Sequence, residues 1–246
     1  LKSITKEISP GSIVILSEIH NLKTHHDKQL KFLKSLYKNN SSNISVGLEF
    51  LYFPDQNYVD QFLNDEISEN KFRTLINWQS QNYSFYRPLI NFPKKSNGYT
   101  LALNAPKSIS SKIARQGINS LSENERKLLP PNFTLGQEKY FQRFKKIMSG
   151  GGHTIPEDKL KNYYTAQCLW DDTMAYYASE FIQNNPDQIL IIIVGDFHAQ
   201  YGGGLPDRLL KRGISKLITI SQVNIRGLSA AEKRKTVLPH ERWGVR

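Results

Sequence analysis

The stretch Ile191–His198, "IIIVGDFH", decides the fold class of this chain. Its uninterrupted aliphatic run suits a β-strand that is covered on both faces, as a central strand of a parallel sheet is. The run then ends in an acid, one spacer residue and a histidine. The stretch Ile15–His20, "ILSEIH", ends in the same way far earlier in the chain. With six histidines in 246 residues, the repeated ending indicates that two strands finish at a common polar site.

Strand-like and helix-like segments alternate along the chain, which predicts an α/β fold with a largely parallel central sheet flanked by helices. The predicted strands are Ser12–Ser17, Ile44–Leu48, Thr100–Asn104, Gln188–Val194 and Leu217–Val223. The predicted helices are Thr24–Tyr37, Asp55–Leu63, Glu69–Gln79, Ser122–Leu129, Gly136–Met148 and Pro156–Asn184. We expect residues 1–105 and 186–246 to form the sheet domain, and residues 106–185 to form a helical insertion that caps it.

Composition limits the function classes. Hydrophobic residues make up 39% and charged residues 22% of the chain, as in globular proteins. The longest aliphatic stretch, Ile189–Val194, is far shorter than the ~20 residues of a membrane-spanning helix. The net charge of +11 is spread over the whole chain, without a recognisable nucleic-acid-binding module. Solvated surface charge is the preferred interpretation, and a basic protein that binds anionic lipid or nucleic acid is a weaker alternative.

Polar residues follow three of the predicted strands. The first strand delivers Glu18 and His20, the second Glu49, and the fourth Asp196 and His198. Because parallel strands end at one edge of a sheet, these side chains are expected to converge there. While the chain stays extended, the acid and the histidine of each triplet share a face. Such a cluster suits a divalent metal or acid–base chemistry; the alternative is that these side chains only bind loop backbone.

The long helix Pro156–Asn184 carries a tyrosine pair, Tyr163 and Tyr164, preceded by His153 in a glycine-rich loop. An aromatic and apolar stripe runs along one helix face at Tyr163, Trp170, Met174, Tyr177 and Phe181. The stripe favours core packing for Tyr163. Tyr164 lies off the stripe and is expected to face a pocket or a partner, and His153 is expected to face solvent.

The turn "AQYGGGLPD" into a helix near Pro206 is a weak indication of an anion site.

Five segments together resemble the ChaN-like haem-binding uptake lipoproteins of bacteria: "SIVILSEIH", "THHDKQL", "ISVGLEF", "TAQCLWDDTMA" and "IIIVGDFHAQYGGGLPDRL". The resemblance spans Ser12 to Val223. This family is related to the erythromycin esterases, the TraB-like proteins and the Tiki metalloproteases, which share a histidine motif at strand ends. The first motif of that group is usually Gly-Glu-x-His, and Ser17 replaces the glycine here.

The resemblance implies a haem-binding protein for iron acquisition at the bacterial outer membrane. It raises Tyr163 and Tyr164 to candidate iron ligands, without distinguishing them, and places His153 beside the haem. It further implies a homodimer with haem bound, an outer-membrane haem receptor as a possible partner, and a lipid anchor upstream of Leu1, facing the periplasm or the outer membrane. Nucleic acid is not an expected partner.

A second hypothesis of a different class is a divalent-metal-dependent hydrolase. In this interpretation His20 and His198 hold the ion, and Glu18 or Glu49 activates its bound water. The related esterases and proteases favour it. The sequence shows no feature specific for a substrate, so haem binding is the preferred hypothesis and enzymatic activity the alternative.

Overall fold

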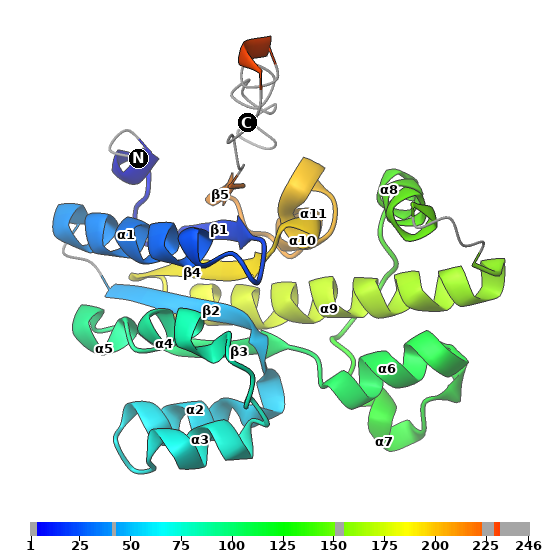
Figure 1. Ribbon diagram of the computed structural model, residues 1–246, viewed down its shortest axis with the longest axis horizontal. Coiled ribbons are helices and arrows are strands. Elements are labelled where there is room, and N and C mark those ends of the chain that lie inside the picture. Colours follow the sequence, from blue (N-terminus) through cyan, green and yellow to red (C-terminus); the bar gives the residue numbers. More distant parts are fainter. Residues whose placement is uncertain (1–3, 41–42, 151–154, 223–228, 232–246) are drawn as a thin grey trace.

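The computed structural model describes residues 4–40, 43–150, 155–222 and 229–231. At its centre lies a five-stranded sheet with the order β3-β2-β4-β1-β5 (Figure 1). The strands are β1 Ile13–Glu18, β2 Asn43–Tyr52, β3 Thr100–Asn104, β4 Gln188–Gly195 and β5 Leu217–Ile220. All four strand pairings are parallel. The predicted α/β fold is therefore confirmed.

The strand register aligns the carboxyl ends of the three middle strands. Glu18 of β1 pairs with Gly195 of β4, and Leu48 of β2 pairs with Ile193 of the same strand. The polar residues that follow these strands therefore meet at one edge of the sheet, as expected for parallel strands.

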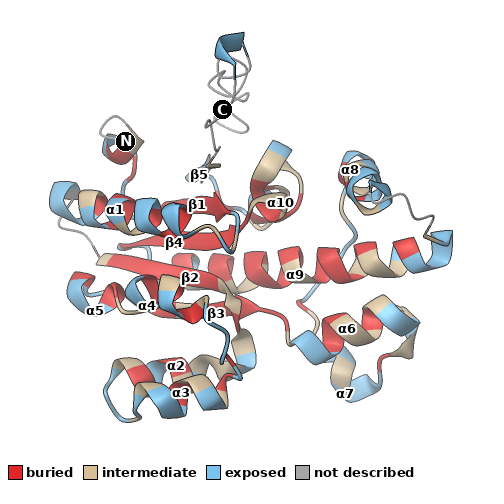
Figure 2. Cartoon of the chain, viewed as in Figure 1, coloured by how far each residue is buried: buried red, intermediate tan, exposed pale blue. Residues whose placement is uncertain are grey.

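Helices cover both faces of the sheet, and this explains the continuous apolar runs. Val14 and Leu16 of β1 face a core that includes α1 and α4, whereas Ile13 and Ile15 face α9 and α11. Figure 2 shows β1 and β4 as buried along their length. The helices are α1 Lys23–Asn40, α2 Gln56–Leu63, α3 Glu69–Leu75, α4 Tyr83–Ile90, α5 Pro93–Ser96, α6 Lys107–Gln116, α7 Glu123–Arg126, α8 Glu138–Ser149, α9 Glu157–Asn184, α10 Asp196–Ala199 and α11 Leu205–Lys211.

Helix α9 links the sheet to the helical insertion. Its second half packs under the sheet through Met174, Ala178 and Ile182. Its first half extends past the strand ends, between α8 on one side and α6 with α7 on the other (Figure 1). The helical insertion thus shares a helix with the sheet core, and its behaviour as a separate domain stays a prediction.

Four helices, α4, α5, α6 and α10, were not expected from the sequence. Helix α4 contains Pro88 in its interior, a residue that normally argues against a helix. Helix α6 contains three serines and buries only Ile109, Ser110 and Ile113, so its apolar face is narrow. A capping box formed by Ser122 and Glu125 stands at the start of α7. Among the described residues, no helix is long and apolar enough to cross a membrane.

Candidate functional site

Side chains from three strands and from α9 meet at the carboxyl edge of the sheet. We call Glu18, His20, Glu49, Asp171 and His198 the strand-end cluster. His20 connects its two halves, because Nδ1 lies 3.2 Å from Glu18 Oε1 and Nε2 lies 3.9 Å from Glu49 Oε1. His198 Nε2 lies 3.4 Å from the same Glu49 oxygen. Four of the five residues predicted to converge, Glu18, His20, Glu49 and His198, are therefore brought together.

Glu18 is buried and surrounded by polar partners from α1 and α4. The Tyr86 hydroxyl donates a hydrogen bond to its Oε1, and Gln29 Nε2 donates to its Oε2 over 2.9 Å. His26 Nδ1 lies 3.1 Å from Oε2. The segment "THHDKQL" thus begins a helix whose first turns hold this carboxylate. Burial beside Glu18 raises the pKa of the Tyr86 hydroxyl, so Tyr86 remains a donor.

The second half of the cluster is a chain of charged groups. The Gly195 amide donates to Glu49 Oε2 over 2.6 Å. His198 Nδ1 lies 2.7 Å from Asp171 Oδ1, and the Tyr140 hydroxyl donates to Asp171 Oδ2 over 2.7 Å. Helix α9 therefore supplies the buried acid Asp171 that orients the histidine, and α8 supplies the hydroxyl that orients the acid.

Around Glu49 and His198, electrostatic attraction shifts the pKa values more strongly than burial does. Burial by itself would raise the pKa of Glu49 and lower that of His198, since it penalises charge. The His198 imidazolium nevertheless lowers the pKa of Glu49 to about 2. Glu49 and Asp171 together raise the pKa of His198 to about 10 against the effect of burial. Burial also opposes charge on His20, but its hydrogen bond to Glu18 and the charge of Glu49 raise its pKa. At neutral pH, Glu49 and His198 form an ion pair.

Gly195 allows His20 to lie close to the sheet edge. A Cβ atom at this position would lie 2.7 Å from His20 Cε1 and 2.9 Å from its Nε2, closer than non-bonded atoms approach. The position requires a residue without a side chain because the imidazole covers it.

Asp196 does not join the strand-end cluster. We expected Asp196 and His198 to share a face of an extended chain, and this expectation was wrong, because both lie in the one-turn helix α10. Their side chains diverge. Asp196 accepts hydrogen bonds from Ser17 and from Gln200, whereas His198 turns towards Glu49 and Asp171. Ser17, which stands where the related proteins usually have glycine, thus binds Asp196 and leaves the strand-end cluster intact.

Several residues of the site were not assigned to it from the sequence, namely His26, Gln29, Tyr86, Tyr140, Gln167 and Asp171. Gln167 donates to the Tyr140 hydroxyl over 3.2 Å. The signal that could have identified Asp171 is its position in the middle of an apolar, aromatic helix, where an acid is costly without a buried partner. His26, Gln29 and Gln167 lie in the segments "THHDKQL" and "TAQCLWDDTMA" that carry the family resemblance, but those segments do not indicate the role of each side chain.

The described residues do not support the expected metal site. No group of three or more histidine, cysteine, aspartate or glutamate side chains within this part of the chain could hold a metal ion. The arrangement is instead suited to acid–base chemistry, since a histidine hydrogen-bonded to a buried carboxylate can accept and return a proton. His20 is the accessible member, with 40% of its side chain exposed against 6% for His198.

The tyrosine pair lies away from this edge, on the first half of α9. Tyr164 is only 4% exposed and packs against the rings of Tyr140, Phe141 and Phe144. The expectation that Tyr164 faces a pocket was therefore wrong. Tyr163 is partly buried at the rim of the same aromatic group. His153 lies outside the described residues.

Tyr163 belongs to a group of partly buried apolar side chains. We call α8 together with the first half of α9 the α8–α9 arm. Phe141, Met148 and Ile155 are only partly buried on this arm, and Ile147 is 57% exposed. Beneath them, the buried Phe144 and Tyr164 form a rigid base. The α8–α9 arm therefore presents aromatic and aliphatic side chains with a phenol at their edge.

Comparisons with known proteins agree on the fold. The family model for haem-binding uptake proteins of the Tiki superfamily, ChaN, matches residues 4–209. A structure of ChaN from Campylobacter jejuni with cofacially bound haem has a TM-score of 0.69 and 18% identity, covering 92% of this chain and 88% of that one. An erythromycin esterase mutant in its open conformation has a TM-score of 0.52 and 12% identity, covering 90% and 71% of the two chains.

One curated plant protein is also similar to this chain. The chloroplastic protein RETICULATA-RELATED 5 of Arabidopsis thaliana is 23% identical over 226 residues, which is 86% of this chain. The match covers 31% of the plant protein. The chain thus spans about a third of the length of this relative.

Proposed function

The chain belongs to the haem-binding uptake, ChaN family of the Tiki superfamily, and on this premise we propose that it binds haem on the α8–α9 arm with Tyr163 as the iron ligand. The observation that supports this proposal is the group of partly buried apolar side chains on the α8–α9 arm, with the Tyr163 phenol at its rim. A haem needs an apolar or aromatic surface for its macrocycle and an axial ligand for its iron. The α8–α9 arm offers both within the described residues.

Tyr163 is a better ligand than its neighbour Tyr164. The Tyr164 hydroxyl lies 3.4 Å from the Gln137 carbonyl oxygen, to which it donates. Burial, together with Cys168 nearby, raises the pKa of the Tyr164 phenol, which opposes the phenolate that ferric iron requires. Tyr163 lies about 100° further round the helix, at the partly exposed rim. Ligation by Tyr163 therefore requires no repacking of the aromatic base, whereas ligation by Tyr164 does.

A second subunit completes the proposed site. The α8–α9 arm can cover one face of a flat macrocycle, and the other face then needs an apolar partner. A second copy of the same arm supplies one through a two-fold axis. The exposed lysines Lys145 and Lys146 of α8 are available to pair with haem propionates. In the solved ChaN structure haem is bound cofacially, which supports haem as the ligand of the proposed site.

We extend the proposal to iron acquisition at the bacterial outer membrane, with a lipid anchor upstream of Leu1 and an outer-membrane haem receptor as partner. Membership of a family of haem-binding uptake proteins supports this role. Ligation by a phenolate holds ferric haem and suits capture and release.

The test is an absorbance titration of the apo-protein with haemin, followed by sizing of the product. The proposal expects a saturable, red-shifted Soret band with the charge-transfer band of phenolate-ligated ferric haem. It also expects a change from monomer to dimer as haem saturates. A spectrum that rises linearly with haemin, without saturation, contradicts haem binding. Saturation without a change in size contradicts the shared site alone.

The strand-end cluster favours a second candidate function, a hydrolase that works by acid–base catalysis without metal. The supporting observation is the pairing of the half-exposed His20 with the buried Glu18 over 3.2 Å. The structural likeness to an erythromycin esterase shows the fold alone, so the substrate class stays open. The test is ester hydrolysis by the wild type and His20→Ala across pH. The raised pKa of His20 predicts that base catalysis increases as pH rises past that value; equal rates for both proteins contradict the candidate.

A further inference from the structure

Exposed lysines gather on the outer face of helix α1. We call them the α1 lysine stripe: Lys28, Lys31, Lys34 and Lys38. Their spacing of three, three and four residues places them on one face of the helix. Phe32, Leu33 and Leu36 lie on the opposite face and belong to the buried core. Figure 2 shows exposed residues along the outer side of α1. Positive charge that is spread along the sequence is therefore concentrated here by the helix.

The charge of this stripe is not neutralised by the described part of the chain. The one acid of α1 itself, Asp27, is bound to Lys23, with 2.6 Å between Asp27 Oδ1 and Lys23 Nζ. Among the described residues, no acid forms an ion pair with a lysine of the stripe. Like charges three and four residues apart repel one another along a helix. An anionic surface outside the chain would offset this repulsion.

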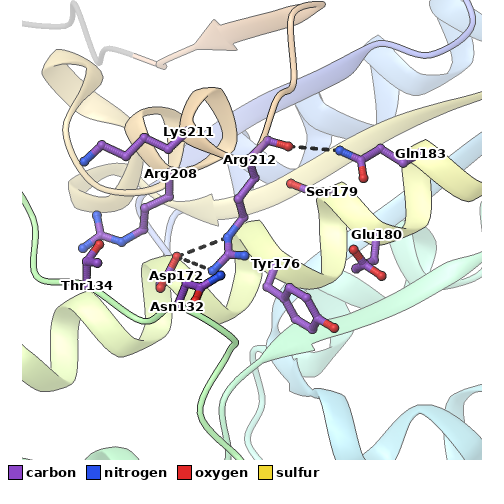
Figure 3. A pocket seen from close by; sticks show the side chains of 10 residues that line it. All are labelled: Asn132, Thr134, Asp172, Tyr176, Ser179, Glu180, Gln183, Arg208, Lys211 and Arg212. Atoms are coloured by element: carbon purple, nitrogen blue, oxygen red, sulfur yellow. Dashed lines mark hydrogen bonds and ion pairs between the residues drawn. The ribbon is translucent and has the colours of Figure 1, made fainter.

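Helix α11 shows how other cations of the protein are accommodated. Arg212, which follows this helix, has its Nη2 2.9 Å from Asp172 Oδ1 of α9 (Figure 3). Lys211 Nζ lies 2.9 Å from Asp207 Oδ2 within α11. Acids of the chain therefore pair with these two cations, whereas the lysines of the α1 lysine stripe are exposed to water. The stripe is suited to an anionic partner outside the chain.

We propose that the α1 lysine stripe binds an anionic phospholipid surface, with α1 parallel to the plane of the membrane. The stripe is about 15 Å long from Lys28 to Lys38, so its ammonium groups contact several headgroups at once. Each lysine near an anionic membrane surface increases the affinity about fivefold. Tyr37, 42% exposed on the same helix, is of a residue type that occupies membrane interfaces.

A membrane fits this surface better than a nucleic acid does. The stripe has lysines and no arginine, although the planar fork of arginine is the usual reader of guanine. Tyr37 is the one exposed aromatic side chain of α1, whereas single-stranded nucleic acids are bound by several stacking rings. Because α1 and α9 cover opposite faces of the sheet, the stripe is separate from the α8–α9 arm. The proposal therefore needs neither haem nor a lipid anchor.

The test is cosedimentation of the protein with vesicles of equal parts phosphatidylglycerol and phosphatidylcholine. The wild type should bind these vesicles saturably at about 0.15 M salt and be released at about 1 M salt, where charges are screened within about 3 Å. It should not bind vesicles of phosphatidylcholine alone. No binding to the anionic vesicles, or equal binding to both kinds, overturns the proposal. Tighter binding of a single-stranded RNA than of the anionic vesicles overturns the assignment to a membrane.

Two triple variants test whether the stripe itself carries the binding. Glutamine replaces lysine in both, because it has a similar helix propensity. The stripe variant is Lys31→Gln, Lys34→Gln and Lys38→Gln. The matched control removes the same charge from exposed lysines elsewhere, as Lys71→Gln, Lys107→Gln and Lys127→Gln.

The stripe variant should bind the anionic vesicles about a hundredfold more weakly than the wild type, since three lysines each contribute about fivefold. The control variant should stay within about fivefold of the wild type, because at about 0.15 M salt charges more than about 8 Å from the membrane are screened. Circular dichroism of both variants verifies that their helices are retained. Equal losses in the two variants would show a response to net charge alone and would overturn the proposal.

Discussion

The strand-end cluster and the α8–α9 arm lie close to one another, but they differ in how far their chemistry is satisfied within the protein. In the strand-end cluster, buried groups such as Glu18 and Asp171 each bind two or more partners. On the arm, apolar side chains such as Ile147 remain exposed to water. A network that is satisfied internally stabilises the fold, whereas exposed apolar surface gains free energy when it is covered.

This difference bears on function. A ligand at the strand-end cluster must compete with existing hydrogen bonds and ion pairs, except at the half-exposed His20. A ligand on the arm covers apolar surface and displaces only water. The comparison therefore supports a large, flat, apolar ligand on the arm, and it predicts that changes in the two regions affect different properties.

His198→Ala should produce the largest effect on stability. It leaves Glu49 and Asp171 as buried carboxylates without their shared cation, and breaking a buried pair costs about 3–5 kcal/mol. Chemical denaturation of both proteins at pH 6 measures this loss. His20→Ala is the control, because its side chain is 40% exposed and its loss should be much smaller. Haem binding should be unchanged in His198→Ala, because the strand-end cluster and the α8–α9 arm affect different properties. A folded His198→Ala variant that loses both stability and haem binding would contradict this separation.

The pH dependence of stability tests the same ion pair. His198, with a pKa raised from 6.5 to about 10, contributes stability that is complete below pH 6.5 and is lost as pH rises through 10. Glu49, with a pKa lowered from 4.5 to about 2, contributes stability that is complete above pH 4.5 and is lost towards pH 2. The free energy of unfolding should therefore be highest between pH 4.5 and 6.5 and fall by about 2–4 kcal/mol at the alkaline end. A maximum near pH 9 contradicts the ion pair.

Gly195→Ala should cost about 1–3 kcal/mol, the usual range for overpacking. The new Cβ atom would lie 2.7 Å from His20 Cε1, so the imidazole must move away from Glu18 and Glu49. Gly150→Ala is the matched control, since its Cβ would approach no atom closer than 3.4 Å. Thermal unfolding of both variants measures the difference. Equal stability of the two variants would show that the position of His20 over Gly195 does not contribute to the stability of the fold.

Tyr164→Phe should produce the smallest effect, about 0.5–1.5 kcal/mol of stability for one lost hydrogen bond. The hydroxyl donates to the Gln137 carbonyl oxygen over a long 3.4 Å, so the lower end is expected. The aromatic base stays packed because the ring is retained. Haem affinity measured alongside should be unchanged, and a large loss of affinity would move the ligand to the buried phenol.

The sequence predicted the strand edge better than the arm. The aliphatic runs and the polar residues that follow them were enough to place Glu18, His20, Glu49 and His198 at one edge, because parallel strands end together. Asp171 comes from a helix more than 100 residues beyond Glu49 in the sequence, and its partner depends on how α9 crosses the sheet. Helical periodicity also gave the wrong orientation for Tyr163 and Tyr164. Helix α8 packs on the face of α9 that carries Tyr164, and no local sequence pattern predicts that contact.

The most direct test of the account is the absorption spectrum of haem-loaded Tyr163→Phe beside that of haem-loaded Tyr164→Phe. Both variants keep the ring and remove one hydroxyl, so packing is matched. The account predicts that Tyr163→Phe loses the charge-transfer band of phenolate-ligated ferric haem and binds haemin at least about tenfold more weakly, while Tyr164→Phe retains the wild-type spectrum. A wild-type spectrum in Tyr163→Phe would contradict the central claim that the α8–α9 arm holds haem through this tyrosine.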